Sequence, residues 1–440
     1  MTPMSRRRIA LVCMTPEPDA SDLGDVRLPS YGIRRILAAV AADPALAGAG
    51  VALVDLVRDD VEAFVTAILR IEPDLVGFSV YVWSLPCLVA VARRIRAERP
   101  QCTIVFGGPS ARPAMFDLAP YAPANSYLDA VVATEGEAVF CEIARLPVLS
   151  RAALRSVVGL HLPSSGPWLQ TGHRAPTDDL DGIASPFQLD LMPAGSVAYL
   201  ETYRGCPLSC RFCEWGASET ARSVFSADYI ERELRAFEAL RSPTVFLLDA
   251  GLNLNARGFR HLLEAERRVG VLRRATFWAE IYPTLIKDEH LEFLSMVGAS
   301  YLGVGLQSLD PEVLRLHDRP FQQGRFEGAL QRIVGVAHAE LQIIFGLPGD
   351  TPAGFARTLA YARSFGIGVR AYHCLVLPDA LLTRGRPGWD MQFDARTMAM
   401  QSCLGWREED ITATRAMLDA ETGVVGGHSG RFWWSFPRAR

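Results

Sequence analysis

Apolar and polar residues alternate in the first third of the chain in a pattern that predicts strands and helices in turn. Short apolar runs typical of buried strands are separated by stretches in which apolar residues recur every three or four positions, as on one face of a helix. Because strands that alternate with helices form parallel sheets, residues 1–145 are predicted to form a doubly wound, Rossmann-like α/β domain. The strand-like runs lie at 9–14, 50–57, 75–83, 103–108 and 128–134, and the helical stretches at 31–42, 61–71, 85–98 and 137–146.

The pattern fades between residues 146 and 195 and then returns. Pro, Ser, Gly and Asp become frequent in 146–195, which is typical of a linker between domains. From 196 to 383 we expect six further strand–helix units, a partial (β/α)6 barrel with its active-site loops at the carboxyl ends of the strands. Residues 384–440 are a C-terminal extension with one helical stretch at 408–421.

The composition favours a cytoplasmic globular protein that acts on a small molecule. A chain of 440 residues with a net charge of −4 is not expected to bind nucleic acid. The apolar run at 9–14 is shorter than the ~7–15 residues of a signal-peptide core, and no apolar stretch reaches the ~18 residues that span a membrane. The nine cysteines are odd in number and irregularly spaced, as in a reducing compartment.

Three cysteines in the stretch RGCPLSCRFCEWG are the residues most indicative of chemistry. Cys206, Cys210 and Cys213 have the spacing C-x3-C-x2-C, and no fourth cysteine lies nearby. A structural zinc site needs four ligands, so a zinc knuckle here would require a distant His or Cys. We favour an iron–sulfur cube held by three thiolates, because one iron then stays open for a further ligand.

Since this loop follows a strand and opens the second series of strands, the sequence resembles the radical S-adenosylmethionine (SAM) enzymes. Their motif carries an aromatic residue, here Phe212, before the last cysteine. The resemblance implies that the three cysteines hold a [4Fe–4S] cluster and that SAM binds its open iron. It also implies SAM contacts at the ends of other strands, although each such residue could instead belong to an ordinary turn. These candidates are Asp249, Glu280, Gln307, Ser308 and Gly346.

The first domain resembles the cobalamin (B12)-binding domain of one radical SAM subclass. The matching segments are LPSYGIRRILAA, PDLVGFSVYVWS, IVFGGPSARP, LDAVVATEGE and DDLDGIASPF. A flat corrin ring needs close approach of the backbone, so contacts are expected where strands end in small or Gly-rich loops. The candidates are Ser79, Tyr81, Trp83, Gly107, Gly108, Pro109 and Glu135. The first histidine is His161, so we expect no histidine ligand below the cobalt.

Together these resemblances imply a cobalamin-dependent radical SAM C-methyltransferase. In that subclass one SAM methylates cobalamin, a second yields a 5′-deoxyadenosyl radical, and methylcobalamin gives its methyl group to a carbon. The expected substrate is a small-molecule or carrier-bound natural-product intermediate. The segment CEWG (213–216) looks like that of tryptophan C-methyltransferases. The family implies an external one-electron reductant of the flavodoxin or ferredoxin type, and we expect neither nucleic acid nor membrane as a partner.

Several alternatives remain at this level. The same cofactors could support a rearrangement or cyclisation without methyl transfer. The first domain could be a scaffold without cofactor, since fold does not imply function. A redox-sensing protein would need an output element, and only one helical stretch follows residue 384. An RNA methylthiotransferase should carry a second cysteine trio and a basic surface, and both are missing.

Overall fold

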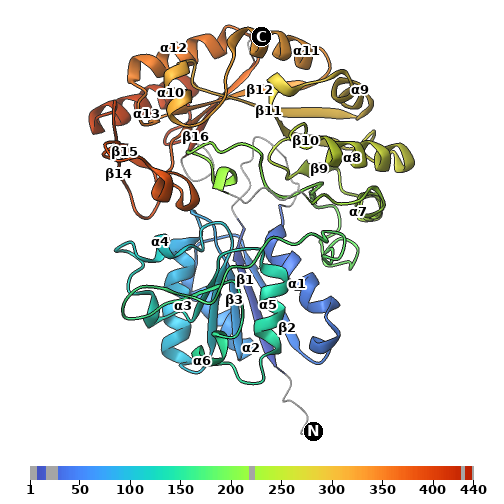
Figure 1. Ribbon diagram of the computed structural model, residues 1–440, viewed down its shortest axis with the longest axis vertical. Coiled ribbons are helices and arrows are strands. Elements are labelled where there is room, and N and C mark those ends of the chain that lie inside the picture. Colours follow the sequence, from blue (N-terminus) through green and yellow to red (C-terminus); the bar gives the residue numbers. More distant parts are fainter. Residues whose placement is uncertain (1–6, 16–27, 218–222, 428–431, 439–440) are drawn as a thin grey trace. The chain divides into compact units, whose positions relative to one another are not determined.

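The computed structural model describes residues 7–15, 28–217, 223–427 and 432–438. These residues form two compact units, which we call unit 1 (up to Pro193) and unit 2 (from Ala194). Each unit is built around one seven-stranded sheet, and unit 2 also carries a two-stranded sheet (Figure 1).

Unit 1 contains the predicted doubly wound sheet. Its strands run in the order β2-β1-β3-β4-β5-β6-β7, with β1 to β5 parallel and β6 and β7 antiparallel at one edge. The winding direction reverses between β1 and β3, and ligands of such sheets bind beyond the carboxyl ends of the strands at this point. The strands are β1 (Arg8–Met14), β2 (Gly50–Leu56), β3 (Leu75–Ser79), β4 (Thr103–Gly107), β5 (Ala130–Val132), β6 (Leu160–Leu162) and β7 (Leu169–Gln170).

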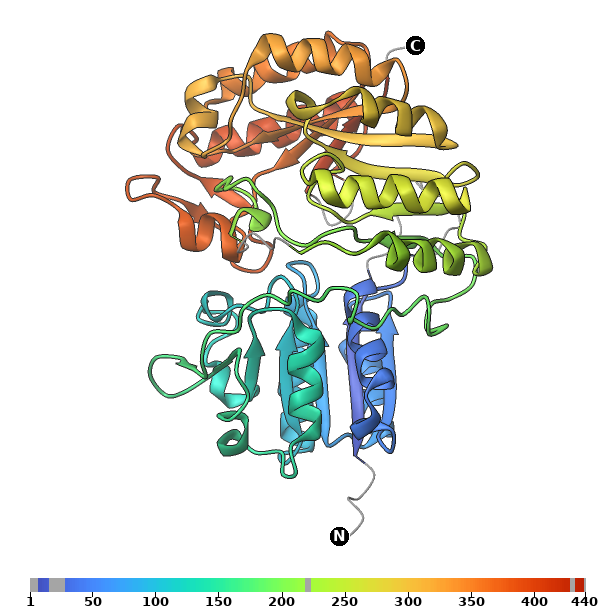
Figure 2. The same ribbon diagram turned by 45° about the vertical axis from the view of Figure 1, so that its right-hand side comes forward.

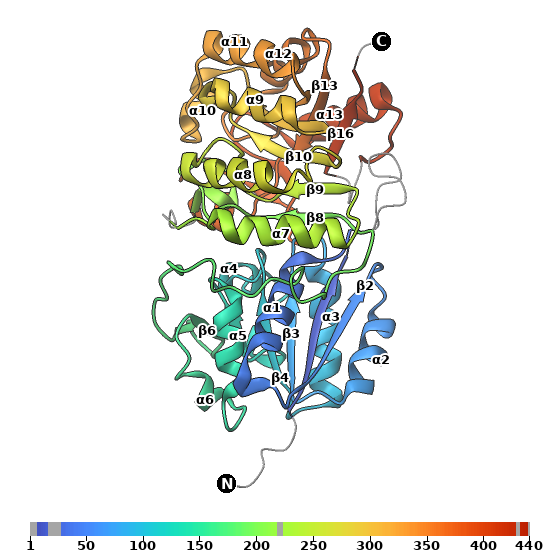
Figure 3. The same cartoon turned by 90° about the vertical axis from the view of Figure 1, so that its right-hand side faces the viewer.

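Helices cover both faces of this sheet. On one face α1 (Tyr31–Ala42) packs beside α5 (Gly136–Arg145), and on the other α2 (Val61–Ile71) packs beside α3 (Leu85–Glu98) (Figure 3). The central strands are therefore buried on both sides, which explains their unbroken apolar runs. The shorter helices are α4 (Pro113–Phe116), α6 (Arg151–Leu154), η1 (Pro44–Leu46) and η2 (Ala124–Ser126).

Most of the stretch expected to be a linker (146–195) lies within unit 1, which extends to Pro193. Its residues form α6 and the two edge strands β6 and β7. Their later part is fastened to the domain, since Arg34 Nη1 donates to the carbonyl of Leu191 at 2.9 Å. The backbone N–H of Thr177 likewise donates to Glu135 Oε2 at 2.9 Å. Strands of three and two residues, the second of them exposed, are too short to leave a periodic signal in the sequence.

Unit 2 contains the six predicted parallel strands in sequential order, β8 to β13, with one added strand. This strand, β16, pairs antiparallel with β13 at the edge. The predicted partial barrel of six strand–helix units is thus confirmed. The strands are β8 (Ala198–Leu200), β9 (Thr244–Leu247), β10 (Thr276–Ile281), β11 (Ala299–Gln307), β12 (His338–Phe345), β13 (Gly368–His373) and β16 (Trp433–Phe436).

The helices that connect these strands cover one face of the sheet (Figure 2). Burial alternates along β11, where Leu302, Val304 and Leu306 are buried under the helices. Tyr301 and Gly303 alternate with them and point to the opposite face, which we call the inner face. The helices of unit 2 are α7 (Ala227–Ala239), α8 (Ala256–Val269), α9 (Asp288–Met296), α10 (Pro311–Leu316), α11 (Gln323–Val334), α12 (Pro352–Arg363), α13 (Glu408–Thr422), η3 (Glu214–Ala217), η4 (Pro283–Leu285) and η5 (Pro378–Leu382).

The C-terminal extension is an integral part of unit 2. After η5 it forms the small sheet of β14 (Gln392–Phe393) and β15 (Met400–Ser402), then α13 and β16. Trp434 on β16 is fully buried, its ring lies 5.7 Å from that of Phe345, and its indole N–H donates to Asp419 Oδ1 at 2.7 Å. The aromatic end of the chain therefore completes the edge of the sheet.

Candidate active site

The cysteine loop leaves the carboxyl end of β8 and is anchored at its root by Asp249. The backbone N–H groups of Thr202 and Tyr203 donate to Asp249 Oδ1 at 2.8 and 3.4 Å, and the Thr202 hydroxyl donates to Oδ2. Asp249 is 4% exposed, and this burial raises the pKa of its carboxyl to about 7. Both oxygens serve the loop, so the structure gives Asp249 an anchoring role, while its predicted SAM contact stays a prediction.

The loop places three free thiols within eight residues. Cys210 is buried, whereas Cys206 and Cys213 are partly accessible. The backbone N–H of Leu208 lies 3.5 Å from Cys206 Sγ, and Arg319 Nη1 lies 3.9 Å from Cys210 Sγ. An N–H donor and a guanidinium both favour negative sulfur, which is the state in which cysteine binds metal.

These donors fit an iron–sulfur cluster better than a single ion. Within the described residues no three His, Cys, Asp or Glu side chains converge to hold one metal ion. A cube bonds each thiolate to a different iron, so its ligands need not meet at one point. Burial raises the pKa of Cys206, so a bound cation would have to displace its proton. The assignment of the three cysteines as cluster ligands stays a prediction.

An arginine from the C-terminal extension donates hydrogen bonds to backbone carbonyls of this loop. Arg384 Nη2 donates to the carbonyls of Cys210 and Cys213 at 2.8 and 2.6 Å, and its Nη1 donates to that of Ser209 at 3.2 Å. In return Arg211 Nη1 donates to the carbonyl of Arg384 at 3.0 Å. The sequence carries no local signal for this contact, because more than 170 residues separate Arg384 from Cys213.

A polar network lies on the inner face, level with the end of β10 and the middle of β11 and β12. Glu280 on β10 is exposed there and accepts a hydrogen bond from Gln342 Nε2 on β12 at 2.9 Å. Gly303 on β11 lies between them, and a Cβ at this position would stand 2.4 Å from both Glu280 Oε1 and Gln342 Nε2. Although the Glu280 side chain stays accessible, the protein atoms packed around it disfavour the charged form and raise the pKa of its carboxyl. The missing side chain of Gly303 thus makes room for a carboxylate with a raised pKa.

The same network continues to the edge of the sheet. Arg370 on β13 pairs with Glu340 on β12, with Nε 2.6 Å from Oε1 and Nη2 3.3 Å from Oε2. From β16, Ser435 Oγ donates to Glu340 Oε2 at 3.3 Å, and the Trp433 ring lies 3.9 Å from the Arg370 guanidinium. Sequence reasoning missed all four residues. Glu340 and Arg370 meet through the pairing of β12 with β13, and the residues of β16 reach them through its pairing with β13.

A row of rings crosses the inner face one layer nearer the amino ends of the strands. Adjacent ring centroids lie 4.6 to 6.3 Å apart. Trp278 Nε1 is buried and has no hydrogen-bond partner in the described part of the chain. The row forms a flat, largely apolar surface beside the polar network, on the side of the amino ends of the strands. Its members are Tyr199, Phe246, Trp278, Tyr301 and His338.

Three other residues predicted to contact SAM also lie in unit 2, together with the aromatic residue of the cysteine motif. Gln307 ends β11 at a bulge with φ of 68°. Ser308 is fully buried and its hydroxyl donates to Asp350 Oδ2 at 3.3 Å. Gly346 has φ of 79°, and a Cβ there would lie 3.1 Å from Ile411 of the extension. Phe212 packs against His317, with ring centroids 5.7 Å apart. Their roles toward SAM stay predictions.

The predicted cobalamin contacts gather at the carboxyl edge of the sheet in unit 1. Gly108, with φ of 98°, follows β4 so closely that a Cβ would stand 2.7 Å from the Val80 carbonyl oxygen. After β3 the Tyr81 and Trp83 rings stack 4.5 Å apart, and Trp83 is 41% exposed. Ser79 and Gly107 end the paired strands β3 and β4, Pro109 is exposed beside Gly108, and Glu135 precedes α5. A close-lying backbone and an exposed flat ring suit a corrin.

A polar cluster at the same edge was not predicted. Thr15 Oγ1 donates to Asp55 Oδ1 at 2.6 Å, and Arg34 Nη2 pairs with Asp55 Oδ2 at 3.1 Å. Ser30 Oγ lies 2.9 Å from Thr15 Oγ1. These residues follow β1, end β2 and open α1, so they flank the point where the winding direction reverses.

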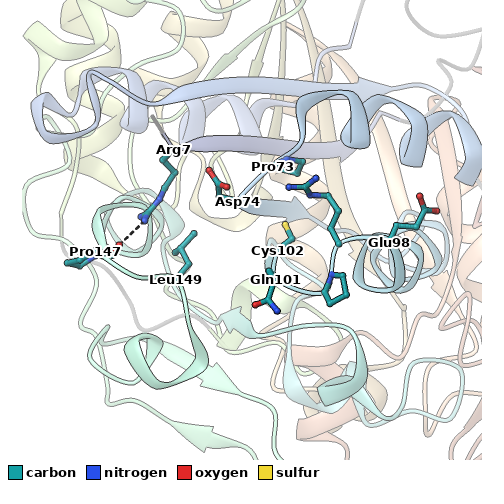
Figure 4. A pocket seen from close by; sticks show the side chains of 10 residues that line it. Arg7, Pro73, Asp74, Glu98, Gln101, Cys102, Pro147 and Leu149 are labelled. Atoms are coloured by element: carbon teal, nitrogen blue, oxygen red, sulfur yellow. Dashed lines mark hydrogen bonds between the residues drawn. The ribbon is translucent and has the colours of Figure 1, made fainter. Parts of the chain in front are cut away.

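A cavity of about 620 Å³ lies away from both sets of candidates, at the opposite end of the unit 1 strands (Figure 4). Its lining residues precede the strands: Arg7 precedes β1, Asp74 precedes β3 and Cys102 precedes β4. Ligands of doubly wound sheets bind at the carboxyl ends, so this cavity is not part of the candidate site.

Two family models match the chain in the predicted order. The B12 binding domain matches residues 27–144, and the Radical SAM superfamily matches residues 200–362. These families imply cobalamin in the first domain and a [4Fe–4S] cluster with SAM in the second, as predicted from the sequence. Residue-level contacts to these cofactors stay predictions.

Two relatives are similar to most of this chain. It is 28% identical over 345 residues to 2-(S-pantetheinyl)-carbapenam-3-carboxylate methyltransferase of Streptantibioticus cattleyicolor. It is 27% identical over 339 residues to the cobalamin-dependent radical SAM methyltransferase TokK of Streptomyces tokunonensis. The alignments cover 70% and 71% of this chain but 48% of each relative, so the chain spans about half the length of these curated relatives.

One solved structure has the same fold. The radical SAM methyltransferase TsrM of Kitasatospora setae, with tryptophan substrate and a SAM analogue bound, matches with a TM-score of 0.68 at 16% identity. The match covers 96% of this chain and 90% of that one, and it supports the fold described above. None of the described helices in our chain is long and apolar enough to cross a membrane.

Proposed function

We propose that this chain, in which a B12-binding domain precedes a radical SAM domain, is a cobalamin-dependent radical SAM enzyme that transfers a methyl group from SAM to a carbon atom. The observation that carries the proposal is the three-cysteine loop at the carboxyl end of β8, in a six-stranded parallel sheet that follows a doubly wound domain. The relatives named as methyltransferases favour methyl transfer over rearrangement.

The residues of unit 2 fit the binding of an iron–sulfur cluster and SAM. Cys206, Cys210 and Cys213 would hold the cluster, with Asp249 and Arg384 fixing the loop from its two ends. When bound, the cluster and SAM would supply the radical that removes hydrogen from carbon, and cobalamin would carry the methyl group. The residues themselves bind, orient and exclude water, which is the contribution a protein makes to cofactor chemistry.

The residues of unit 1 would hold cobalamin through backbone approach rather than through a histidine. Gly108 brings its backbone against Val80, and Tyr81 and Trp83 present a stacked pair of rings beside it. Burial raises the pKa of Tyr81 to about 12, so its hydroxyl stays protonated and can donate. No histidine precedes His161 in the sequence.

The substrate is a small-molecule or carrier-bound intermediate of natural-product type. This proposal follows the relatives, one named for a pantetheinyl carbapenam carboxylate and one bound to tryptophan. The inner face of unit 2 supports it, since the aromatic row offers flat apolar surface and Glu280 and Arg370 offer charge above it. An external one-electron donor of the flavodoxin or ferredoxin type would reduce the cluster, and the cytoplasm would be the site of action.

The test is reconstitution followed by labelled methyl transfer. Protein purified without oxygen is loaded with iron, sulfide and hydroxocobalamin, and its metal and corrin contents are measured. We expect about four irons and one corrin per chain. SAM labelled with deuterium in its methyl group is then supplied with a low-potential reductant and extracts of small molecules, and products are examined by mass spectrometry.

The outcomes separate the parts of the proposal. A product that gains the labelled methyl group on carbon would support it. A cluster without bound corrin would make unit 1 a scaffold and remove the basis for methyl transfer. Turnover of SAM with an altered but unlabelled product would instead point to rearrangement or cyclisation.

A further inference from the structure

The side chain of Arg384, the first residue of the C-terminal extension, contacts the cysteine loop through several hydrogen bonds. The guanidinium of Arg384 donates to three carbonyls of the loop, those of Ser209, Cys210 and Cys213. Its Nε donates to the carbonyl of Asp379 in η5, just before the extension, at 2.8 Å. All three guanidinium nitrogens thus donate hydrogen bonds. Two of the three loop carbonyls that accept them belong to predicted cluster ligands.

A side chain of the loop also donates to the backbone of the extension, so hydrogen bonds run in both directions between the two segments. Arg211 lies between Cys210 and Cys213 in sequence and donates from Nη1 to the carbonyl of Arg384. Its Nε pairs with Asp318 Oδ2 at 2.7 Å, and its backbone N–H donates to the carbonyl of His317 at 3.0 Å. The turn at 317–318 therefore holds one side of the loop while Arg384 holds the other.

We propose that Arg384 is a positioning residue for the cluster, which keeps the cysteine loop in its metal-binding shape and favours the reduced state of the cluster through its charge. This inference rests on the proposed function, because it concerns the cluster that the function requires. It assigns a role to the C-terminal extension that neither the sequence nor the family comparisons indicate.

The geometry explains the positioning role. Carbonyl dipoles that point at a guanidinium are turned away from sulfur, which leaves N–H groups such as that of Leu208 to face the thiolates. Without Arg384 the carbonyls of Cys210 and Cys213 would lose their charged donor. Hydrogen bonds to charged groups are among the stronger ones in proteins, so the loop would become free to adopt other shapes.

The charge explains the redox role. Reduction of the cluster adds one electron from the external donor, with no bond made or broken. A fixed positive charge close to the ligands stabilises that added negative charge, so it raises the reduction potential. Arg384 keeps its charge at all physiological pH values, since guanidinium groups do not deprotonate there.

The two roles are separable by substitution. Arg384→Gln removes both the charge and the planar set of guanidinium N–H donors. Arg384→Lys keeps the charge but has a single nitrogen that cannot reach all the carbonyls. Arg396→Gln is the matched control, because Arg396 is an exposed residue of the same extension and its backbone N–H, which the substitution leaves in place, donates to Asp394.

The experiment uses the full chain reconstituted with iron and sulfide. Release of iron to a chelator and the midpoint potential of the cluster, measured by electron paramagnetic resonance during redox titration, are compared in the four proteins. We expect Arg384→Gln to lose iron about tenfold faster than the unsubstituted protein and to have a lower potential. Arg384→Lys should lose iron faster but keep a potential close to the original, and Arg396→Gln should match the original in both.

The results also distinguish this inference from the proposed function. If the unsubstituted chain binds no cluster, the proposed function fails and circular dichroism of the apoprotein shows whether the fold is intact. If it binds a cluster and Arg384→Gln behaves like Arg396→Gln, the inference about Arg384 is overturned while the function stands. Should Arg384→Gln fail to fold, an iron-release rate of Arg384→Lys equal to that of the original would overturn it.

Discussion

Asp249 and Thr202 form a tight junction between two neighbouring strands of unit 2, in which both the backbone N–H and the hydroxyl of Thr202 donate to the Asp249 carboxylate. This junction sits where the cysteine loop departs from the sheet. A buried carboxyl with three donors is costly to ionise and costly to replace, so it fixes the starting direction of the loop.

The first prediction concerns the pH dependence of this junction. The pKa of Asp249 is about 7 in the folded chain and ~3.9 in an unfolded one, so the folded state binds a proton between these values. Its contribution to stability therefore increases as the pH falls through about 7. Below that pH the free energy of unfolding should rise by up to about 1.4 kcal/mol per pH unit relative to Asp249→Asn, in which this group cannot titrate.

Urea unfolding of both proteins at about pH 8, 6.5 and 5 measures the effect, because other titrating groups cancel in the difference. Parallel pH curves for the two proteins would show that Asp249 stays ionised and contradict the prediction.

The second prediction concerns the cluster ligands. Cys210→Ala should lose most of the iron that the unsubstituted protein retains, because two thiolates hold a cube poorly. Cys87→Ala is the control, since Cys87 is also a buried thiol but lies on α3 of unit 1. Iron and sulfide analysis after anaerobic reconstitution decides the matter. Equal iron in Cys210→Ala and Cys87→Ala would remove Cys210 from the ligand set.

The third prediction concerns Gly303. A methyl group at this position would stand 2.4 and 2.5 Å from the Glu280 carboxylate oxygens, so Gly303→Ala must displace that side chain on the inner face. Since a long side chain such as that of Glu280 can change rotamer, we expect a cost in stability of less than about 1.5 kcal/mol but a several-fold weaker binding of SAM. Gly324→Ala on α11 has open space around its Cβ and should not affect binding.

Isothermal titration of SAM into the reconstituted proteins provides the comparison. If Gly303→Ala binds SAM as tightly as Gly324→Ala does, Glu280 is not a SAM contact.

The fourth prediction concerns Gly108. Its φ of 98° disfavours any side chain, and a Cβ would meet the Val80 backbone at 2.7 and 2.9 Å. Gly108→Ala should therefore destabilise unit 1 by about 1–3 kcal/mol and reduce its retention of cobalamin on gel filtration. Gly48→Ala, with nothing within 4 Å of its Cβ, should do neither. Full cobalamin retention by Gly108→Ala would place the corrin elsewhere.

The sequence by itself determined the strands, the helices and the cysteine trio. Strands β1 to β5 and β8 to β13 carry apolar runs or alternation, because each residue's burial depends on which face of its own element it occupies. The spacing of Cys206, Cys210 and Cys213 is equally local. Such short-range features are visible in the order of residues alone, and the family comparisons confirm the domains to which they belong.

Only the tertiary structure decided which distant residues meet these local features. Arg384 reaches the cysteine loop, and Trp433 and Ser435 reach Arg370 and Glu340, through the packing of the C-terminal extension against the sheet. The edge strands β6 and β7 likewise exist because they pair with β5, not because their few residues have a strong pattern. Contacts of this kind depend on how whole elements pack against one another, and the free energy of that packing is not encoded in any one segment.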